Sequence, residues 1–213
     1  MFPFLRGASS REPSVLPLFP LKTVLFPGGV LPLKVFEQRY ITMTKACLKD
    51  DSPFGVCLLT QGDEVVANTA AARAGLAFTP IGTLARITAW DMPQLGILHL
   101  RTEGVTRFQV QTHTIAEDGL VVGQVTPLAP EPALALPDAF KPLANLLELL
   151  INRVGKENFP AELALTDASW VSYRLAEILP LPLSSMLCLI GSGNGSEVRL
   201  KVLAQFLKQQ GLL

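Results

Sequence analysis

The sequence predicts an α+β fold, in which a strand-rich first half, residues 15–129, precedes a helical second half, residues 130–213. Short apolar runs, some of them alternating with polar residues, fill the first half. Apolar residues at helical spacing fill the second half. A proline-rich stretch at 129–138 separates the two halves and is typical of a stiff linker. Residues 1–14 show no such pattern, and we expect them to form a loose N-terminus.

The first two strands are expected to be short and bent. Residues 15–21 and 30–36 predict a hairpin around the Pro-Gly-Gly turn at 27–29. Prolines within strands are confined to edges, ends and bulges, so these strands fit a small irregular barrel better than a flat sheet. Residues 37–50 then change to helical spacing and predict a short helix.

The rest of the first half predicts further strands, at residues 54–60, 80–90, 96–103, 106–114 and 120–128. The small and polar residues 61–76 are expected to form a long loop, and "DMPQ" and "EG" are expected to be turns. In "ILHLRT" the alternation places the leucines on one face and His99 and Arg101 on the other.

The second half predicts four helices. Asp138 is expected to cap the first, and Thr166 or Asp167 the second. A short apolar helix at 183–190 follows, and Ser196 is expected to cap the last helix. In that last helix three leucines share the inward face, namely Leu200, Leu203 and Leu207.

Composition excludes several classes of protein. The formal net charge is zero and no basic run occurs, so the electrostatic footprint of a nucleic-acid binder is missing. The three cysteines form no CxxC motif, and Cys57 and Cys188 lie in apolar runs where we expect buried thiols. The start lacks the pattern of a signal peptide, and no apolar run reaches the ~18 residues of a membrane span. We therefore expect a cytoplasmic protein without membrane association.

No catalytic or metal-binding motif is found. The glycine-rich run "GSGNGSEV" lacks the lysine of a phosphate-binding loop. His99 and His113 have no cysteine, histidine or carboxylate at ligand spacing. The sequence therefore predicts no catalytic residue, no cofactor and no metal ion.

Six residues make up the candidate binding site: Phe36, Glu37, Arg39, Tyr40, Glu103 and Arg107. They form two clusters, one at a strand-to-helix junction and one around Gly104. One interpretation is that these charges fix the end of the barrel, with Glu37 beside the positive end of the helix dipole and an arginine holding a carboxylate. The other is that they line a cleft that grips an extended peptide.

The run "LPLFPLKTVLFPGGVLPLKVFEQRY", with "FGVCLL", "GTLARI" and "EGVTRFQV", resembles the N-terminal domain of Lon-type ATP-dependent proteases. It is most similar to stand-alone bacterial proteins that consist of that domain. The resemblance extends from Val15 to the end of the chain and includes "WVSYRLAEILPLP". It implies a six-stranded pseudobarrel of the PUA-like type with one short helix, followed by a helical bundle.

In the full proteases this domain helps to recognise and hold substrate proteins, and the ATPase and Ser–Lys peptidase lie downstream. No Walker motif occurs in the 213 residues, so we expect no enzymatic activity. The resemblance implies a protein-binding module that recognises exposed, unfolded or tagged protein segments. It would act as an adaptor or regulator of proteolysis, with a protease or chaperone as a further partner. Two alternatives remain: an RNA-binding PUA-like protein, and a small-molecule-binding protein with a pocket between the two halves.

Overall fold

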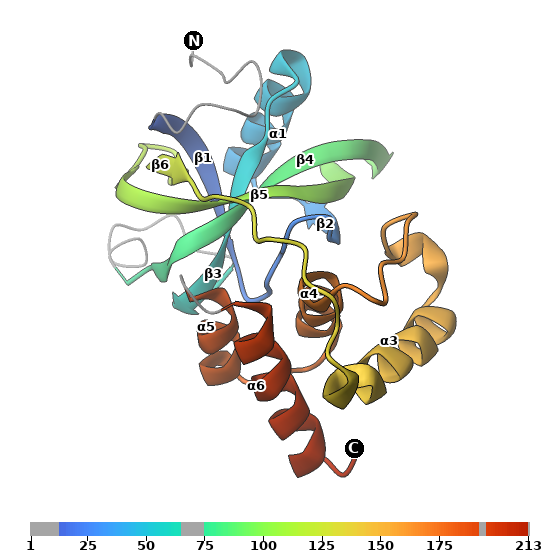
Figure 1. Ribbon diagram of the computed structural model, residues 1–213. Helices are drawn as coiled ribbons and strands as arrows, with labels where there is room; N and C mark the ends of the chain where they lie inside the picture. The colour runs from blue at the N-terminus through green and yellow to red at the C-terminus, as the bar shows by residue number, and fades with distance from the viewer. Residues whose placement is uncertain (1–12, 65–74, 192–194, 213) are drawn as a thin grey trace. The chain divides into compact units, whose positions relative to one another are not determined.

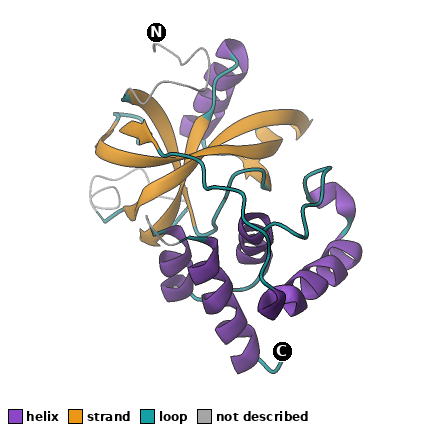
Figure 2. Cartoon of the chain, viewed as in Figure 1, coloured by secondary structure: helices purple, strands orange, loops and turns teal. Residues whose placement is uncertain are grey.

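The computed structural model describes residues 13–64, 75–191 and 195–212. The chain divides into two compact units, Met1–Ala129 and Pro130–Leu213. Within the described residues the fold is mixed α/β, with one six-stranded sheet and five α-helices (Figures 1 and 2). The expected loose N-terminus lies outside the described residues except for its last two positions, where Ser14 already begins a strand. Most of the predicted loop at 61–76 also lies outside them.

The sheet of the first unit is built from β1 (Ser14–Leu21), β2 (Val30–Val35), β3 (Phe54–Gln61), β4 (Ala77–Gln94), β5 (Ile97–Ile115) and β6 (Val121–Pro127). The strand order is β2-β5-β4-β3-β1-β6, and β5 also pairs with β6. This extra pairing closes β5, β4, β3, β1 and β6 into a ring. β2 and β6 therefore share one edge of the long strand β5, along residues 98–103 and 108–115 respectively.

The predicted hairpin between the first two strands is wrong, although both strands exist. β1 pairs with β3 and β6, whereas β2 pairs with β5. The Pro-Gly-Gly turn contacts β5 instead. The Gly28 N–H donates to the Gly104 carbonyl at 2.7 Å, and the Gly104 N–H donates to the Gly29 carbonyl at 2.8 Å. Long-range pairing has replaced the local pairing that the turn residues favoured.

The predicted "EG" turn is also wrong, because Gly104 lies inside the single strand β5. A Cβ atom at Gly104 would lie 2.2 Å from the Phe26 carbonyl oxygen. The glycine thus permits a close approach of two backbones, which is a common role of glycine within strands. The turn between β4 and β5 is Leu95–Gly96, just after the predicted "DMPQ", and Gly96 has a φ of 82°.

Two apolar clusters form the core of the first unit. One lies beneath α1 (Gln38–Asp50) and includes Tyr40, Ile41 and Met43 with residues of the sheet. The other is formed by Leu16, Leu18, Cys57, Phe108, Val121 and Val125. The alternation predicted in "ILHLRT" is confirmed, because its leucines are buried while His99 and Arg101 are exposed.

The helices of the second unit are α3 (Lys141–Val154), α4 (Ala168–Ile178), α5 (Leu183–Ile190) and α6 (Ser196–Gln209), with single 3-10 turns at Asp138–Phe140 and Lys156–Asn158. The predicted cap at Asp167 is confirmed, because its carboxylate accepts the Trp170 N–H at 2.7 Å. The three inward leucines of α6 are fully buried. The residue before α6 is Gly195, so the cap predicted at Ser196 is displaced by one position.

The proline-rich stretch is packed onto the second unit. The Leu134 carbonyl accepts the Ala168 N–H at 2.8 Å, and the Leu136 N–H donates to the Thr166 carbonyl at 2.8 Å. A linker with these contacts is part of the helical unit. Of the cysteines expected to be buried, Cys57 is buried and Cys188 is exposed, because Cys188 lies on the outer face of α5.

Candidate functional site

The junction between β2 and α1 holds a compact charged cluster. Arg39 Nη2 lies 2.8 Å from Glu37 Oε2, and Arg39 Nη1 donates to the Gly119 carbonyl at 2.9 Å. The guanidinium also lies 4.5 Å from the centre of the Tyr40 ring. Only 8% of Arg39 is exposed. Its side chain therefore ties the start of α1 to the turn between β5 and β6.

Tyr40 extends this cluster into the core. Its ring stacks on Phe19 with the centroids 3.8 Å apart. Burial raises the pKa of Tyr40 to about 12. Burial also raises the pKa of Glu37, and the charge and hydrogen bond of Arg39 only partly offset this. These contacts favour the interpretation that the cluster fixes one end of the sheet.

The structure places Glu103 and Arg107 away from this cluster. Glu103 lies opposite Val30 at the start of β2, whereas Glu37 follows the end of β2. The five residue steps of β2 correspond to about 17 Å along the strand. Arg107 lies still further along β5, opposite Thr83. The six predicted residues thus form two separate groups at opposite ends of β2.

Phe36 differs from its neighbours because it is 50% exposed. It follows the last residue of β2, beside the buried cluster. It is the member of the first predicted group whose side chain is most accessible to a partner.

An exposed apolar surface that the sequence did not predict lies at the end of the β4–β5 hairpin. Trp90, Met92 and Leu95 are 55%, 38% and 93% exposed, and we refer to these three residues as the hairpin tip. The paired ends of β4 and β5 project from the rest of the sheet (Figure 1). The signal in the sequence was "AWDMPQLG", in which large apolar residues occupy a segment predicted to be a turn.

One residue of the hairpin tip, Trp90, lies on the same face of the sheet as a residue of the core. Trp90 lies opposite the buried Leu100, and directly opposed residues share a face of the sheet. Met92 lies further along β4, where the pairing with β5 is irregular between Asp91 and Gln94. The half-buried Leu33 and Ile87 also pack against the buried cluster. Trp90 therefore shares its face of the sheet with a residue of the buried cluster.

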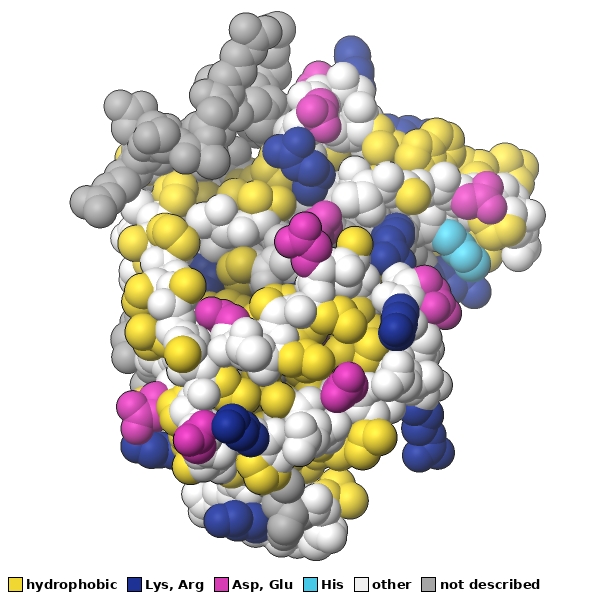
Figure 3. Space-filling model, turned by 45° about the vertical axis from the view of Figure 1, so that its right-hand side comes forward, with side chains coloured by type: hydrophobic (Ala, Val, Ile, Leu, Met, Phe, Trp, Pro, Cys, Tyr) yellow, Lys and Arg dark blue, Asp and Glu magenta, His cyan; other side chains and the backbone are white. Residues whose placement is uncertain are grey.

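Three further observations concern metal binding, membrane-spanning helices and the charge of the surface. Among the described residues, no three His, Cys, Asp or Glu side chains are placed to hold a metal ion together. None of the described helices combines the length and the apolar composition that a membrane-spanning helix requires. On the face shown in Figure 3, lysine and arginine side chains are interspersed with acidic ones and form no large basic patch.

The comparisons with known proteins all match Lon-type proteins. The family model of the ATP-dependent protease La (LON) substrate-binding domain matches residues 15–208. The crystal structure of a Lon N-terminal domain protein from Xanthomonas campestris matches with a TM-score of 0.69 and 35% identity, over 91% of this chain and 98% of that chain. The N-terminal domain of a Mycobacterium avium complex Lon protease shares the fold, with a TM-score of 0.59 and 17% identity, over 92% of this chain and 98% of that chain.

Two curated proteases match about half of the chain. Lon protease 2 of Myxococcus xanthus is 35% identical over 107 residues, which are 49% of this chain and 12% of the protease. The Lon protease of Anaeromyxobacter dehalogenans is 33% identical over 99 residues, which are 46% of this chain and 11% of the protease. The matched region is thus a small part of each protease.

Proposed function

The chain belongs to the family of ATP-dependent protease La (LON) substrate-binding domains, as its motifs predicted, and we propose that it is a non-catalytic module that binds unfolded protein segments at the hairpin tip. The observation that carries the proposal is the exposure of three large apolar side chains, Trp90, Met92 and Leu95, at the end of one hairpin. A folded protein buries most side chains of this kind, so an unfolded chain is the partner that offers complementary apolar groups.

The energetics favour the hairpin tip as the binding surface. Removing a large apolar side chain from water stabilises a complex by about 1.5–3 kcal/mol. Tryptophan is among the residues that dominate binding energy at protein interfaces. Trp90, Met92 and Leu95 can therefore contribute to the affinity for an apolar segment, each in proportion to the surface that it still exposes.

Binding through apolar side chains at the hairpin tip is favoured over the pairing of a partner strand with the edge of the sheet. In the described part of the sheet, β2 pairs with β5 alone and so has an open edge. Pro32 lies in the middle of β2 and has no N–H to donate, and the exposed Lys34 adds a charge. Prolines and lysines on edge strands oppose pairing with further strands. An extended segment would therefore bind poorly along β2.

The family membership also supports proposals about the fold type, the location and the partners. We propose that the first unit is a pseudobarrel of the PUA-like type, which the ring of strands supports, and that the helices of the second unit form a bundle. The module would hold unfolded or tagged substrates in the cytoplasm as an adaptor or regulator of proteolysis, for a separate protease or chaperone. It would lack peptidase activity of its own.

The proposal is tested by fluorescence anisotropy with labelled, reduced and carboxymethylated α-lactalbumin. Native α-lactalbumin and a labelled single-stranded RNA serve as comparison ligands. The variant Trp90→Ser/Met92→Ser/Leu95→Ser should bind the unfolded chain at least about tenfold more weakly, which corresponds to ~1.4 kcal/mol.

A matched control removes apolar side chains elsewhere. Leu149, Val154 and Leu163 are 68%, 46% and 38% exposed in the second unit. The variant Leu149→Ser/Val154→Ser/Leu163→Ser should keep the affinity of the unmodified protein. Equal losses in both triple variants, or tighter binding of RNA than of the unfolded protein, would refute the proposal.

A further inference from the structure

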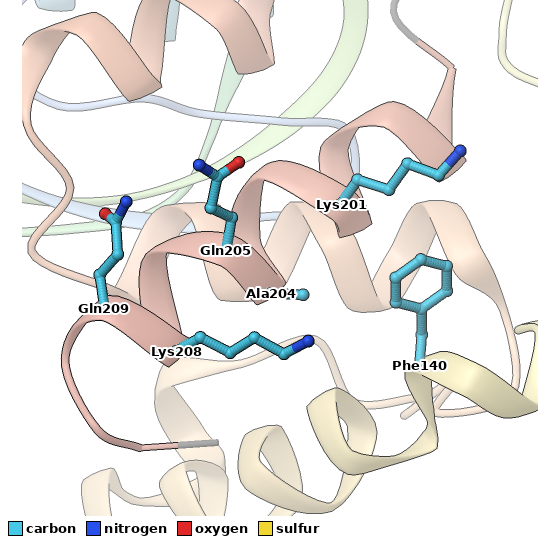
Figure 4. A pocket seen from close by; sticks show the side chains of 6 residues that line it. All are labelled: Phe140, Lys201, Ala204, Gln205, Lys208 and Gln209. Atoms are coloured by element: carbon cyan, nitrogen blue, oxygen red, sulfur yellow. The ribbon is translucent and has the colours of Figure 1, made fainter.

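A hollow in the second unit lies between α6 and the turn before α3. It has a volume of about 500 Å³ and is lined by Phe140, Lys201, Ala204, Gln205, Lys208 and Gln209 (Figure 4). It is open to solvent, so a partner would lie against it and would not be enclosed by it. We refer to it as the α6 hollow.

The spacing of the lining residues explains how α6 forms one wall. Lys201, Ala204, Gln205 and Lys208 lie at intervals of three and four residues, so they share one face of the helix. The inward leucines occupy a different face. Ala204 is small and lies between the two lysines, and the half-buried Phe140 forms the apolar wall across from α6 (Figure 4). Ala204 and Phe140 thus give the hollow an apolar part with a lysine at each end, and Gln205 and Gln209 complete its lining.

The side chains that line the α6 hollow carry a net positive charge. Its lining contains two lysines and no acidic residue among the described positions. Lys201 pairs with Glu197 at 2.7 Å, but both side chains are about two-thirds exposed, at 64% and 65%. Such a pair contributes little and exchanges readily with another carboxylate. Lys208 makes no ion pair within the described ranges.

From this geometry we propose that the α6 hollow binds an acidic amphipathic helix of a protein partner. The two lysines are seven residues apart, which is about 10.5 Å along α6. A partner helix with carboxylates at the same spacing matches both lysines, and a leucine or phenylalanine midway between them meets Phe140 and Ala204. The small Ala204 lets the partner approach closely, and recognition of a helix by the face of another is a common mode. The inference rests on the proposed function only in that the ligand is a protein.

The test uses the full chain and two labelled helical peptides. One carries glutamates seven residues apart on either side of a leucine, and the other carries glutamines in their place. We expect the acidic peptide to bind at least about tenfold more tightly than the neutral one at low salt, and to lose this advantage at high salt because charge attraction is screened.

Substitutions of the residues that line the α6 hollow test whether the peptide binds there. Lys201→Gln/Lys208→Gln should abolish the preference for the acidic peptide, and Ala204→Trp should weaken binding by filling the hollow without changing the charge. The control Lys45→Gln/Lys49→Gln removes two exposed lysines from α1 and should have no effect.

Each result of these titrations either supports or contradicts binding of the acidic helix at the α6 hollow. Equal binding of the two peptides, no binding of either, or an unchanged preference in Lys201→Gln/Lys208→Gln would overturn it. Titration of the same variant with unfolded α-lactalbumin keeps the two proposals apart, because the hairpin tip is intact there. Loss of acidic-peptide binding alone supports the α6 hollow, and loss of both ligands would contradict its independence.

Discussion

Arg199 of α6 holds Glu131 of the proline-rich stretch through two parallel hydrogen bonds, Nη1 to Oε1 at 2.7 Å and Nη2 to Oε2 at 2.5 Å. Arg199 is fully buried, and its guanidinium lies 4.3 Å from the centre of the Tyr173 ring. Ser169 adds a hydrogen bond to Glu131 at 3.0 Å. Because Glu131 is the second residue of its unit, this network fixes the entry of the chain into the helices.

Replacement of Glu131 by alanine should lower the free energy of unfolding of the second unit by about 3 kcal/mol, because it leaves a buried arginine without its carboxylate. Urea unfolding followed by circular dichroism measures this loss. The control Asp138→Ala breaks the exposed pair with Lys141 and should cost less than about 1 kcal/mol. Similar losses in the two variants would show that the Arg199–Glu131 pair does not hold the unit together.

The same pair makes stability depend on pH. Burial by itself would raise the pKa of Glu131, but hydrogen bonds from Arg199, Tyr173 and Ser169 and the charge of Arg199 hold it below the usual 4.5. A carboxyl whose pKa is depressed on folding stabilises the native state above its unfolded pKa, and this contribution is lost as the pH falls through its folded pKa. The free energy of unfolding should therefore decline below about pH 4.5.

Urea unfolding at a series of pH values, for the unmodified protein and Glu131→Gln, checks this dependence. The difference in stability between the two proteins should be constant near neutral pH and should shrink in acid, where Glu131 of the unmodified protein is protonated. A difference that is independent of pH would exclude Glu131 as the titrating group.

Gly104→Ala should destabilise the first unit by about 2–3 kcal/mol, because the added methyl group would overpack a closed contact. The alanine Cβ would lie 2.2 Å from the Phe26 carbonyl oxygen, which is a backbone atom that cannot rotate away. The control Gly195→Ala meets nothing within 4 Å and should cost less than about 1 kcal/mol. Thermal unfolding of both variants measures the difference, and equal melting temperatures would contradict the role given to Gly104.

The helices and the alternation of strands were predictable because they depend on local periodicity. The inward leucines of α6 and the cap at Asp167 each involve residues within one or two turns of a helix. A helical pattern of this kind can be recognised within a short window of sequence. The family resemblance was likewise readable from contiguous motifs, and the match to residues 15–208 confirmed it.

Strand partners and the exposed site were not predictable in the same way. β1 pairs with β3 and not with its neighbour in the sequence, and such long-range choices depend on the whole sheet. Gly104 predicts a turn as readily as a close contact, because glycine is common in both, and only the position of Phe26 separates the two. The hairpin tip was missed because burial is a property of the fold, so the exposure of Trp90 could not be read from its sequence neighbours.

The six residues predicted from the sequence can be separated into structural and binding roles. Arg39→Met should lower the free energy of unfolding of the first unit by about 3 kcal/mol, because Glu37 loses its partner and the Gly119 carbonyl loses its donor. At a temperature where this variant is folded, its affinity for unfolded α-lactalbumin should match that of the unmodified protein.

Two further variants complete this separation. Glu103→Gln/Arg107→Gln changes the second predicted group and should leave the affinity unchanged, since both residues lie far from the hairpin tip along β5. Phe36→Ser removes a side chain that is 50% exposed and should leave stability within about 1 kcal/mol, as is usual for exposed positions. If instead Arg39→Met, Glu103→Gln/Arg107→Gln and Phe36→Ser each weakened binding while the serine triple variant of the hairpin tip did not, the predicted residues would be the binding site. The hairpin tip would then be an exposed apolar surface without a part in substrate recognition.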